Sequence, residues 1–213
     1  MPMLTEIINY FIGLATEWSL LLNIPYPWNL LLCVFILSLI FCFLVIILGF
    51  LIQKLKDIVY WLLYKRIGPK LAGFICFRLT FPGTVIHEFS HATFAVLSGA
   101  KVIKIQCFST KKDTLGYVEY QPRGRKIQQQ IQHSFTSAAP TIVGIILTPI
   151  FLDLAINSTA IWMNILFWYL SICMLLHMNM SDLDIKNYFK GLPVIFVLLF
   201  IINYFLVKIN LSR

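Results

Sequence analysis

Residues 87–91 read His-Glu-Phe-Ser-His, so two histidines four positions apart flank a glutamate. On a helix, positions i and i+4 lie one above the other on the same face, and both imidazoles can reach one metal ion. Zn²⁺ binds imidazole nitrogens at about 2.0–2.1 Å, and the adjacent glutamate can take a proton from a water at the ion. The pattern therefore predicts a zinc site with His87 and His91 as ligands and Glu88 as general base.

Composition makes a chance occurrence of this motif rare. The chain contains four histidines and four glutamates in 213 residues, so the expected number of such motifs is on the order of 10⁻³. The surrounding segment is apolar, and an ionisable side chain at bilayer depth costs about 3 kcal/mol on insertion scales. The alternative is a structural role, in which His87, Glu88 and His91 only hydrogen-bond to one another in a polar core. This alternative explains less well why three such side chains lie in an apolar segment.

The remainder of the metal shell must come from further along the chain. The extended metzincin pattern needs a Gly and a His where this sequence has Phe94 and Leu97. A glutamate ligand in a later span is excluded, because Glu119 is the only glutamate after the motif and falls in a predicted hairpin. An Asp or a His must then complete the site, and the candidates are Asp153, His177, Asp182 and Asp184. Of these, Asp153 falls in a predicted loop, where a solvated carboxylate is expected.

The composition is that of a membrane protein. Hydrophobic residues make up 59% of the chain and charged residues 12%, against about half and about a quarter in soluble domains. The net charge of +8 comes from basic residues between apolar runs, which favours lipid headgroups and the positive-inside rule over nucleic acid. The five cysteines include no CxxC pair, which argues against a thiolate zinc site and a disulfide framework.

Hydrophobic patterning predicts an all-α membrane protein in one domain, residues 1–213. We expect about five membrane segments, at residues 28–52, 74–98, 135–156, 160–180 and 192–207. A full crossing by segment 74–98 would put the basic loops 53–72 and 101–126 on opposite sides, against the positive-inside rule. A partly re-entrant segment with a break at Pro82-Gly83 is the alternative, and both stay open. An interfacial helix is expected within residues 1–26 and a basic one at 53–72, ended by Gly68 and Pro69. Alternating patterns on both sides of STKKDT predict a β-hairpin at 101–120.

The segment FPGTVIHEFSHATFAVLSGAKV, followed by a hairpin, a SAAP segment and a late Asp, resembles the site-2-protease-like M50 intramembrane metallopeptidases. The resemblance covers about residues 74–190, the expected catalytic core. It implies that His87, His91 and one of Asp182 or Asp184 bind zinc. We favour Asp184, with Asp182 and His177 as alternatives. The family's late motif, Asn…Pro…Asp-Gly, is only partly present, since no Pro lies between Asn179 and Asp184 and Ile185, not Gly, follows Asp184.

The same resemblance implies a zinc-dependent endopeptidase that cleaves within or next to the membrane, with Glu88 activating the attacking water. The expected partners are the lipid bilayer and a membrane-protein or membrane-associated peptide substrate. The hairpin would either pair with an unwound segment of that substrate or serve as a plain basic connector. The expected location is a bacterial plasma membrane, with several crossings. Two other classes stay open: a non-catalytic adapter or immunity/transport accessory that keeps the fold, and a metal-ion transporter.

Overall fold

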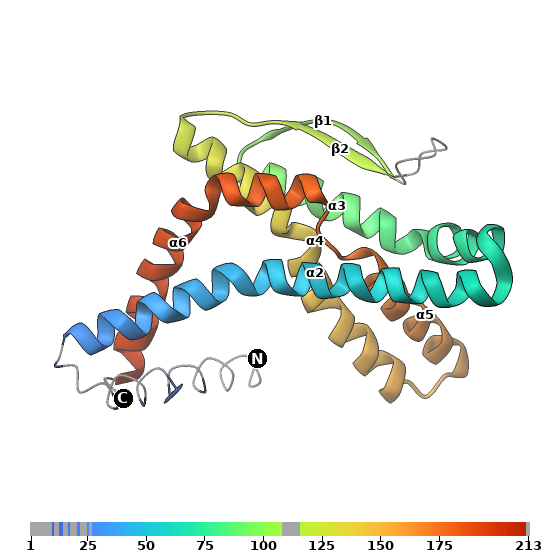
Figure 1. Ribbon diagram of the computed structural model, residues 1–213, viewed down its shortest axis with the longest axis horizontal. Helices are drawn as coiled ribbons and strands as arrows, with labels where there is room; N and C mark the ends of the chain where they lie inside the picture. The colour runs from blue at the N-terminus through green and yellow to red at the C-terminus, as the bar shows by residue number, and fades with distance from the viewer. Residues whose placement is uncertain are drawn as a thin grey trace. The chain divides into compact units, whose positions relative to one another are not determined.

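A computed structural model describes residues 27–107 and 116–211, together with scattered positions before residue 27. The interfacial helix expected within residues 1–26 lies largely outside the described residues, as does the hairpin turn. The elements, in chain order, are α2 (Trp28–Gly73), η1 (Phe74–Leu79), α3 (Phe81–Leu97), β1 (Lys101–Gln106), β2 (Tyr117–Gln121), α4 (Lys126–Asn157), α5 (Ile161–His177) and α6 (Asp182–Leu211) (Figure 1).

Helix α2 runs for 46 residues, where the sequence predicted a span at 28–52 and a separate interfacial helix at 53–72. No break falls at residue 53, because the change from apolar to basic side chains there does not interrupt a helical backbone. The end of the membrane span at residue 52 and the interfacial position of residues 53–72 stay predictions. No proline occurs in α2 before Pro69, and the lysines and glutamine after residue 52 are good helix formers. The kink falls at Gly68, whose φ of 78° lies in the left-handed region.

The segment that carries the HExxH motif consists of a short π-helix, η1, and the 17-residue helix α3. The break between them falls at Thr80 rather than at Pro82-Gly83. Pro82 lies in the first turn of α3, where a helix needs no backbone donor and proline is favoured. At 1.5 Å per residue α3 is about 25 Å long, shorter than the roughly 30 Å hydrocarbon core of a bilayer.

The predicted hairpin is confirmed as an antiparallel pair of β1 and β2, with Lys101 opposite Gln121 and Gln106 opposite Tyr117. A register shift between Val102 and Lys104 leaves Ile103 as an extra residue, a β-bulge. Gly99, with φ 91°, ends α3 and turns the chain into β1. Both strands pack along α3, so the hairpin covers the helix that carries the motif (Figure 1).

The fold is largely helical, as expected, with one small sheet among the described residues. In the described part, three helical stretches are long and apolar enough to cross a membrane: Trp28–Leu79, Lys126–Asn157 and Asp182–Ile209. Helix α5, Ile161–His177, is apolar but shorter. The expected number of about five membrane segments stays a prediction.

Two compact units can be distinguished, Val45–Gly191 on the one hand and Met1–Leu44 with Leu192–Arg213 on the other. The second unit is held by an apolar cluster of Leu30, Val34, Leu37 and Val207. The first contains α3, the hairpin, α4, α5 and the start of α6, and therefore every candidate site residue described below. A single functional domain over the whole chain stays a prediction.

Candidate metal centre

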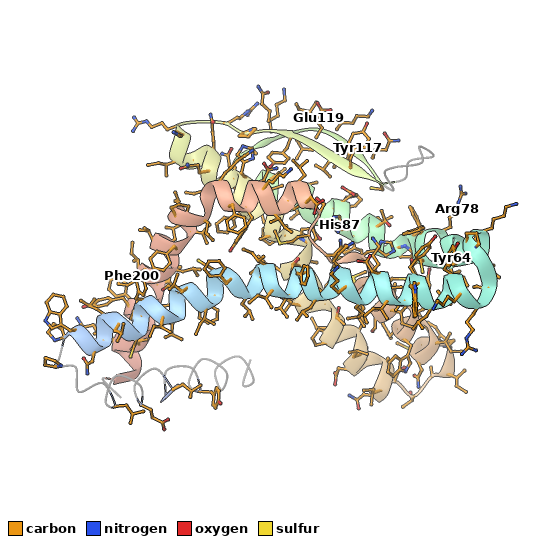
Figure 2. All side chains as sticks on the ribbon, in the orientation of Figure 1. Tyr64, Arg78, His87, Tyr117, Glu119 and Phe200 are labelled. Atoms are coloured by element: carbon orange, nitrogen blue, oxygen red, sulfur yellow. The ribbon has the colours of Figure 1, made fainter. Side chains whose placement is uncertain are left out.

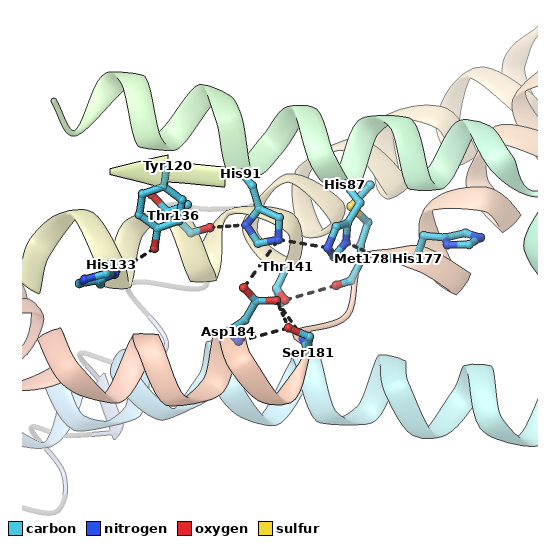
Figure 3. Close-up of polar contacts among 10 residues, drawn as sticks. All are labelled: His87, His91, Tyr120, His133, Thr136, Thr141, His177, Met178, Ser181 and Asp184. Atoms are coloured by element: carbon cyan, nitrogen blue, oxygen red, sulfur yellow. Dashed lines mark hydrogen bonds and ion pairs between the residues drawn. The ribbon is translucent and has the colours of Figure 1, made fainter. Parts of the chain in front are cut away.

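His87 and His91 lie one turn apart on α3 and direct their Nε2 atoms toward each other at 3.1 Å (Figure 3). Each imidazole is held at its other nitrogen by a backbone carbonyl. His87 Nδ1 lies 2.6 Å from the carbonyl oxygen of His177, and His91 Nδ1 lies 2.7 Å from that of Thr136. A carbonyl oxygen can only accept a hydrogen bond, so both Nδ1 atoms carry the proton and donate it. In the neutral imidazoles, both Nε2 atoms then present lone pairs.

Asp184 reaches the same point from the first turn of α6. Its Oδ1 lies 3.7 Å from His91 Nε2, too far for a hydrogen bond. Its Oδ2 accepts hydrogen bonds from the Ser181 backbone N–H at 3.0 Å and from the Ser181 hydroxyl at 2.6 Å. The Asp184 N–H donates in return to Ser181 Oγ at 3.2 Å. This reciprocal pairing is a capping box with aspartate as its acid, and it leaves Oδ1 turned toward the histidines.

The three side chains fit a divalent metal. Their ligand atoms lie within 4.8 Å of one another, and all of them are electron-pair donors that repel unless a cation lies between them. Ligands at about 2.0–2.1 Å from a tetrahedral metal stand about 3.3 Å apart, close to the 3.1 Å between the two Nε2 atoms. Both histidines donate a hydrogen bond to a backbone carbonyl, and Asp184 accepts from Ser181. Hydrogen bonds of this kind orient metal ligands.

The other candidates for a third ligand lie elsewhere. The hydroxyl of Thr80 donates to the Cys76 carbonyl, so it accepts from His177 Nε2 at 2.7 Å, and Thr84 Oγ1 lies 3.2 Å from His177 Nδ1. With both ring nitrogens engaged, His177 contributes its carbonyl rather than its imidazole to the site.

The two remaining aspartates are both exposed. Asp182 lies at the start of α6 and does not belong to the group of ligand atoms. Asp153 belongs to helix α4, not to the expected loop, and accepts a hydrogen bond from Asn157 Nδ2 at 2.7 Å. The loop prediction is wrong because α4 continues through Pro149 as far as Asn157. Of the four candidates, the structure brings only Asp184 to the two histidines.

Glu88 follows His87 on α3 and is 6% exposed. The backbone just before β2 passes over its carboxyl group, since a β-carbon at Gly116 would lie 3.0 Å from Glu88 Oε1. Glu88 lines a cavity of about 570 Å³ together with His87, His91 and Asp184. The same cavity is lined by Tyr117, Val118 and Tyr120 of β2. Figure 2 shows Tyr117 above the helix that carries His87. A substrate in this cavity would meet Glu88, the candidate ligands and a β-strand together.

Several residues that shape the site did not emerge from the sequence. Ser181 has a readable signal, because Ser-x-x-Asp before an apolar run is a variant capping box. The carbonyls of Thr136 and His177 have no such signal, since any residue offers one. Tyr120 hydrogen-bonds to His133 Nδ1 at 3.0 Å. Burial, reinforced by the charge of Asp184, raises the pKa of Tyr120 to about 12, so its hydroxyl stays protonated beside the cavity.

The geometry defines a candidate metal site beside a buried carboxylate, and the comparison with known families points to a peptidase. The profile of the Peptidase M50B-like family matches residues 72–210, about two thirds of the chain. The chain therefore belongs to the Peptidase M50B-like family, in accord with its resemblance to site-2-protease-like peptidases. No curated protein and no solved structure matches it.

Proposed function

We propose that the protein is a zinc-dependent endopeptidase that cleaves peptide bonds within or next to a membrane. The observation that carries the proposal is the convergence of two imidazole lone pairs and one carboxylate oxygen within 4.8 Å, with Glu88 in the same cavity. Membership of a peptidase family supports hydrolysis of peptide bonds. Three helical stretches apolar and long enough to cross a bilayer support a membrane location.

His87, His91 and Asp184 would hold the metal. Two imidazoles and one carboxylate are the ligand set of many catalytic zinc sites, which keep a further position open for water or substrate. Zinc, when bound, would act as a Lewis acid toward the scissile carbonyl and would make a nearby water more acidic.

Glu88 would serve as the proton carrier. Its carboxylate would take one proton from the attacking water as the water oxygen bonds to the scissile carbonyl carbon. The same proton would pass to the amide nitrogen when the C–N bond breaks, giving a carboxylic acid and an amine. The buried position of Glu88, covered by the backbone at Gly116, keeps bulk water from competing for that proton.

The strand β2 would orient the substrate. Its residues Tyr117, Val118 and Tyr120 line the cavity, and each strand of a two-stranded sheet has one edge without a strand partner. A substrate segment that adds to such an edge becomes extended and exposes its peptide bonds, which a helix would hide. This arrangement suits a membrane-protein or membrane-associated peptide as substrate.

The test uses purified full-length protein, its bound metal and a Glu88→Gln variant. We expect about one equivalent of zinc in both proteins. In detergent, the parent should cleave peptides at least 10²-fold faster than the variant. Equal activity of the two proteins, or a parent that binds no zinc, would contradict the proposal. Retention of full cellular function by Glu88→Gln would instead support a non-catalytic adapter.

A further inference from the structure

Lys56 on α2 is a cationic side chain in the wall of the same cavity, and the proposed hydrolysis does not use it. It lines the cavity together with Phe77, His177 and Glu88. The residue is only partly exposed. Among the described residues Lys56 takes part in no ion pair. Its ammonium lies 5.7 Å from the centre of the Phe77 ring, a cation–π contact of modest strength.

Two carboxylates near Lys56, those of Asp57 and Asp184, are hydrogen-bonded to other groups, although the charge of Asp57 still acts on the ammonium. Asp57, the next residue on α2, is exposed and accepts a hydrogen bond from Gln53 Nε2 at 3.3 Å. Asp184 is held by Ser181 and directed at His91. His177 offers no acceptor to the ammonium, because the hydroxyls of Thr80 and Thr84 engage both of its ring nitrogens.

A half-buried ammonium that forms no ion pair is unfavourable, and its charge is best neutralised by a bound anion. The cavity as a whole also favours an anion. With a divalent metal, the carboxylates of Glu88 and Asp184 and the ammonium of Lys56, it would carry one net positive charge. An anionic group on the substrate would neutralise that charge.

We propose that Lys56 is a specificity-determining residue that binds a carboxylate of the substrate. This inference rests on the proposed peptidase function. The substrate class is a peptide with a carboxylate near the scissile bond. A cube with the volume of the cavity, about 570 Å³, is about 8 Å on a side, which an extended chain crosses in two to three residues. The carboxylate, from an Asp or Glu side chain or from a free C-terminus, would therefore lie within about three residues of the scissile bond.

Lys54 provides a matched control on the same helix. It is exposed and lies over the Phe50 ring at 5.3 Å, a contact like that of Lys56, but it does not line the cavity. The variants are Lys56→Met, which removes the charge at similar length, Lys56→Arg, which keeps it, and Lys54→Met. Each is made both in the parent protein and in Glu88→Gln, so that binding can be measured without turnover.

The probes are dye-labelled decapeptides of Ala and Leu that carry one Glu or one Gln at successive positions. Each is prepared with a C-terminal carboxylate or amide. Affinities come from fluorescence anisotropy of the zinc-loaded Glu88→Gln proteins in detergent, and relative kcat/KM values from competition between the Glu and Gln peptides. For at least one position we expect the acidic peptide to bind about tenfold more tightly. This preference should be lost in Lys56→Met and kept in Lys56→Arg and Lys54→Met.

The two pairs of probes, Glu against Gln and C-terminal carboxylate against amide, distinguish a side-chain carboxylate from a C-terminal one. A preference for Glu over Gln assigns Lys56 to a side chain, and a preference for acid over amide assigns it to a chain terminus. Equal affinities for all four forms, or a preference that survives Lys56→Met, would overturn the proposal.

Failure of the peptidase function gives a different pattern. In that case no peptide is cleaved by the parent, while the Lys56-dependent affinity remains. Cleavage without any charge preference would instead overturn the role of Lys56 and leave the peptidase function standing.

Discussion

The rings of His87 and His91 are oriented through their Nδ1 atoms, which face away from the metal position. Each Nδ1 donates to a backbone carbonyl, at 2.6 and 2.7 Å, which selects one tautomer and directs both Nε2 lone pairs to the same point. Asp184 is held in a comparable way by Ser181. The HExxH pattern itself contains no information on these partners.

The assignment of the third ligand can be tested by a matched pair of variants. Asp184→Asn keeps the shape of the side chain but removes the negative charge that faces His91, so zinc affinity should fall at least tenfold. Asp182→Asn makes the same change at an exposed position two residues earlier and should leave affinity within about twofold of the parent. Competition with a fluorescent zinc chelator measures both. The reverse order would assign Asp182 as the ligand.

Ser181 should matter through Asp184 rather than through direct contact with the metal. Ser181→Ala removes the hydroxyl that donates to Asp184 Oδ2 at 2.6 Å, so the carboxylate loses one of its two restraints. Loss of such an orienting partner typically costs 10–100-fold in metal affinity, and we expect a value near the lower end. Ser181→Thr should restore most of the affinity, which a purely structural role of the small side chain would not explain.

At the scale of elements, α3 is positioned by close contact with its neighbours. A β-carbon at Gly83 would lie 2.3 Å from the Cys173 carbonyl oxygen of α5 and 2.8 Å from His177 Cδ2. Only glycine allows this approach, and it brings the His177 carbonyl within reach of His87. Pro82 marks the start of α3 in the sequence. The close contact with α5, which requires Gly83, appears only in the folded chain.

Gly83→Ala should therefore displace α3 from α5. We expect a loss of stability of about 1–3 kcal/mol, as for other overpacked helix contacts, together with weaker zinc binding. Gly73→Ala is the control, because its φ of −63° is helical and its nearest neighbour lies at 3.9 Å. Thermal unfolding in detergent should show a lower midpoint for the first variant and no decrease for the second.

At the scale of the whole molecule, the candidate ligands come from segments nearly 100 residues apart, α3 and the start of α6. A metal held by both should stabilise the fold, because it binds the folded chain and not the unfolded one. Removal of zinc with a chelator should lower the unfolding midpoint by several degrees, and added zinc should restore it.

A double variant, His87→Ala with His91→Ala, should unfold at the same temperature with and without the chelator. If the chelator lowers its midpoint as much as that of the parent, the stabilising metal lies elsewhere in the protein.

The sequence by itself determined the membrane character, the hairpin, the break near Gly68 and the proximity of His87 and His91. These features depend on local patterns: apolar runs, alternation, helix breakers and the i, i+4 spacing of one helix. Even so, local patterns did not show that α2 continues as one helix through the change of polarity at residue 53. They left the functional roles of His87, Glu88 and His91 as predictions that the folded chain makes chemically reasonable.

Only the tertiary structure decided which of four distant candidates lies beside the histidines. Asp182 and Asp184 are nearly equivalent in sequence, but two residues on a helix are about 200° apart around its axis, so only one of them can face α3. The tertiary structure also brought Lys56 to the wall of the cavity. Each of these outcomes depends on contacts between distant segments, which no spacing within a single segment encodes.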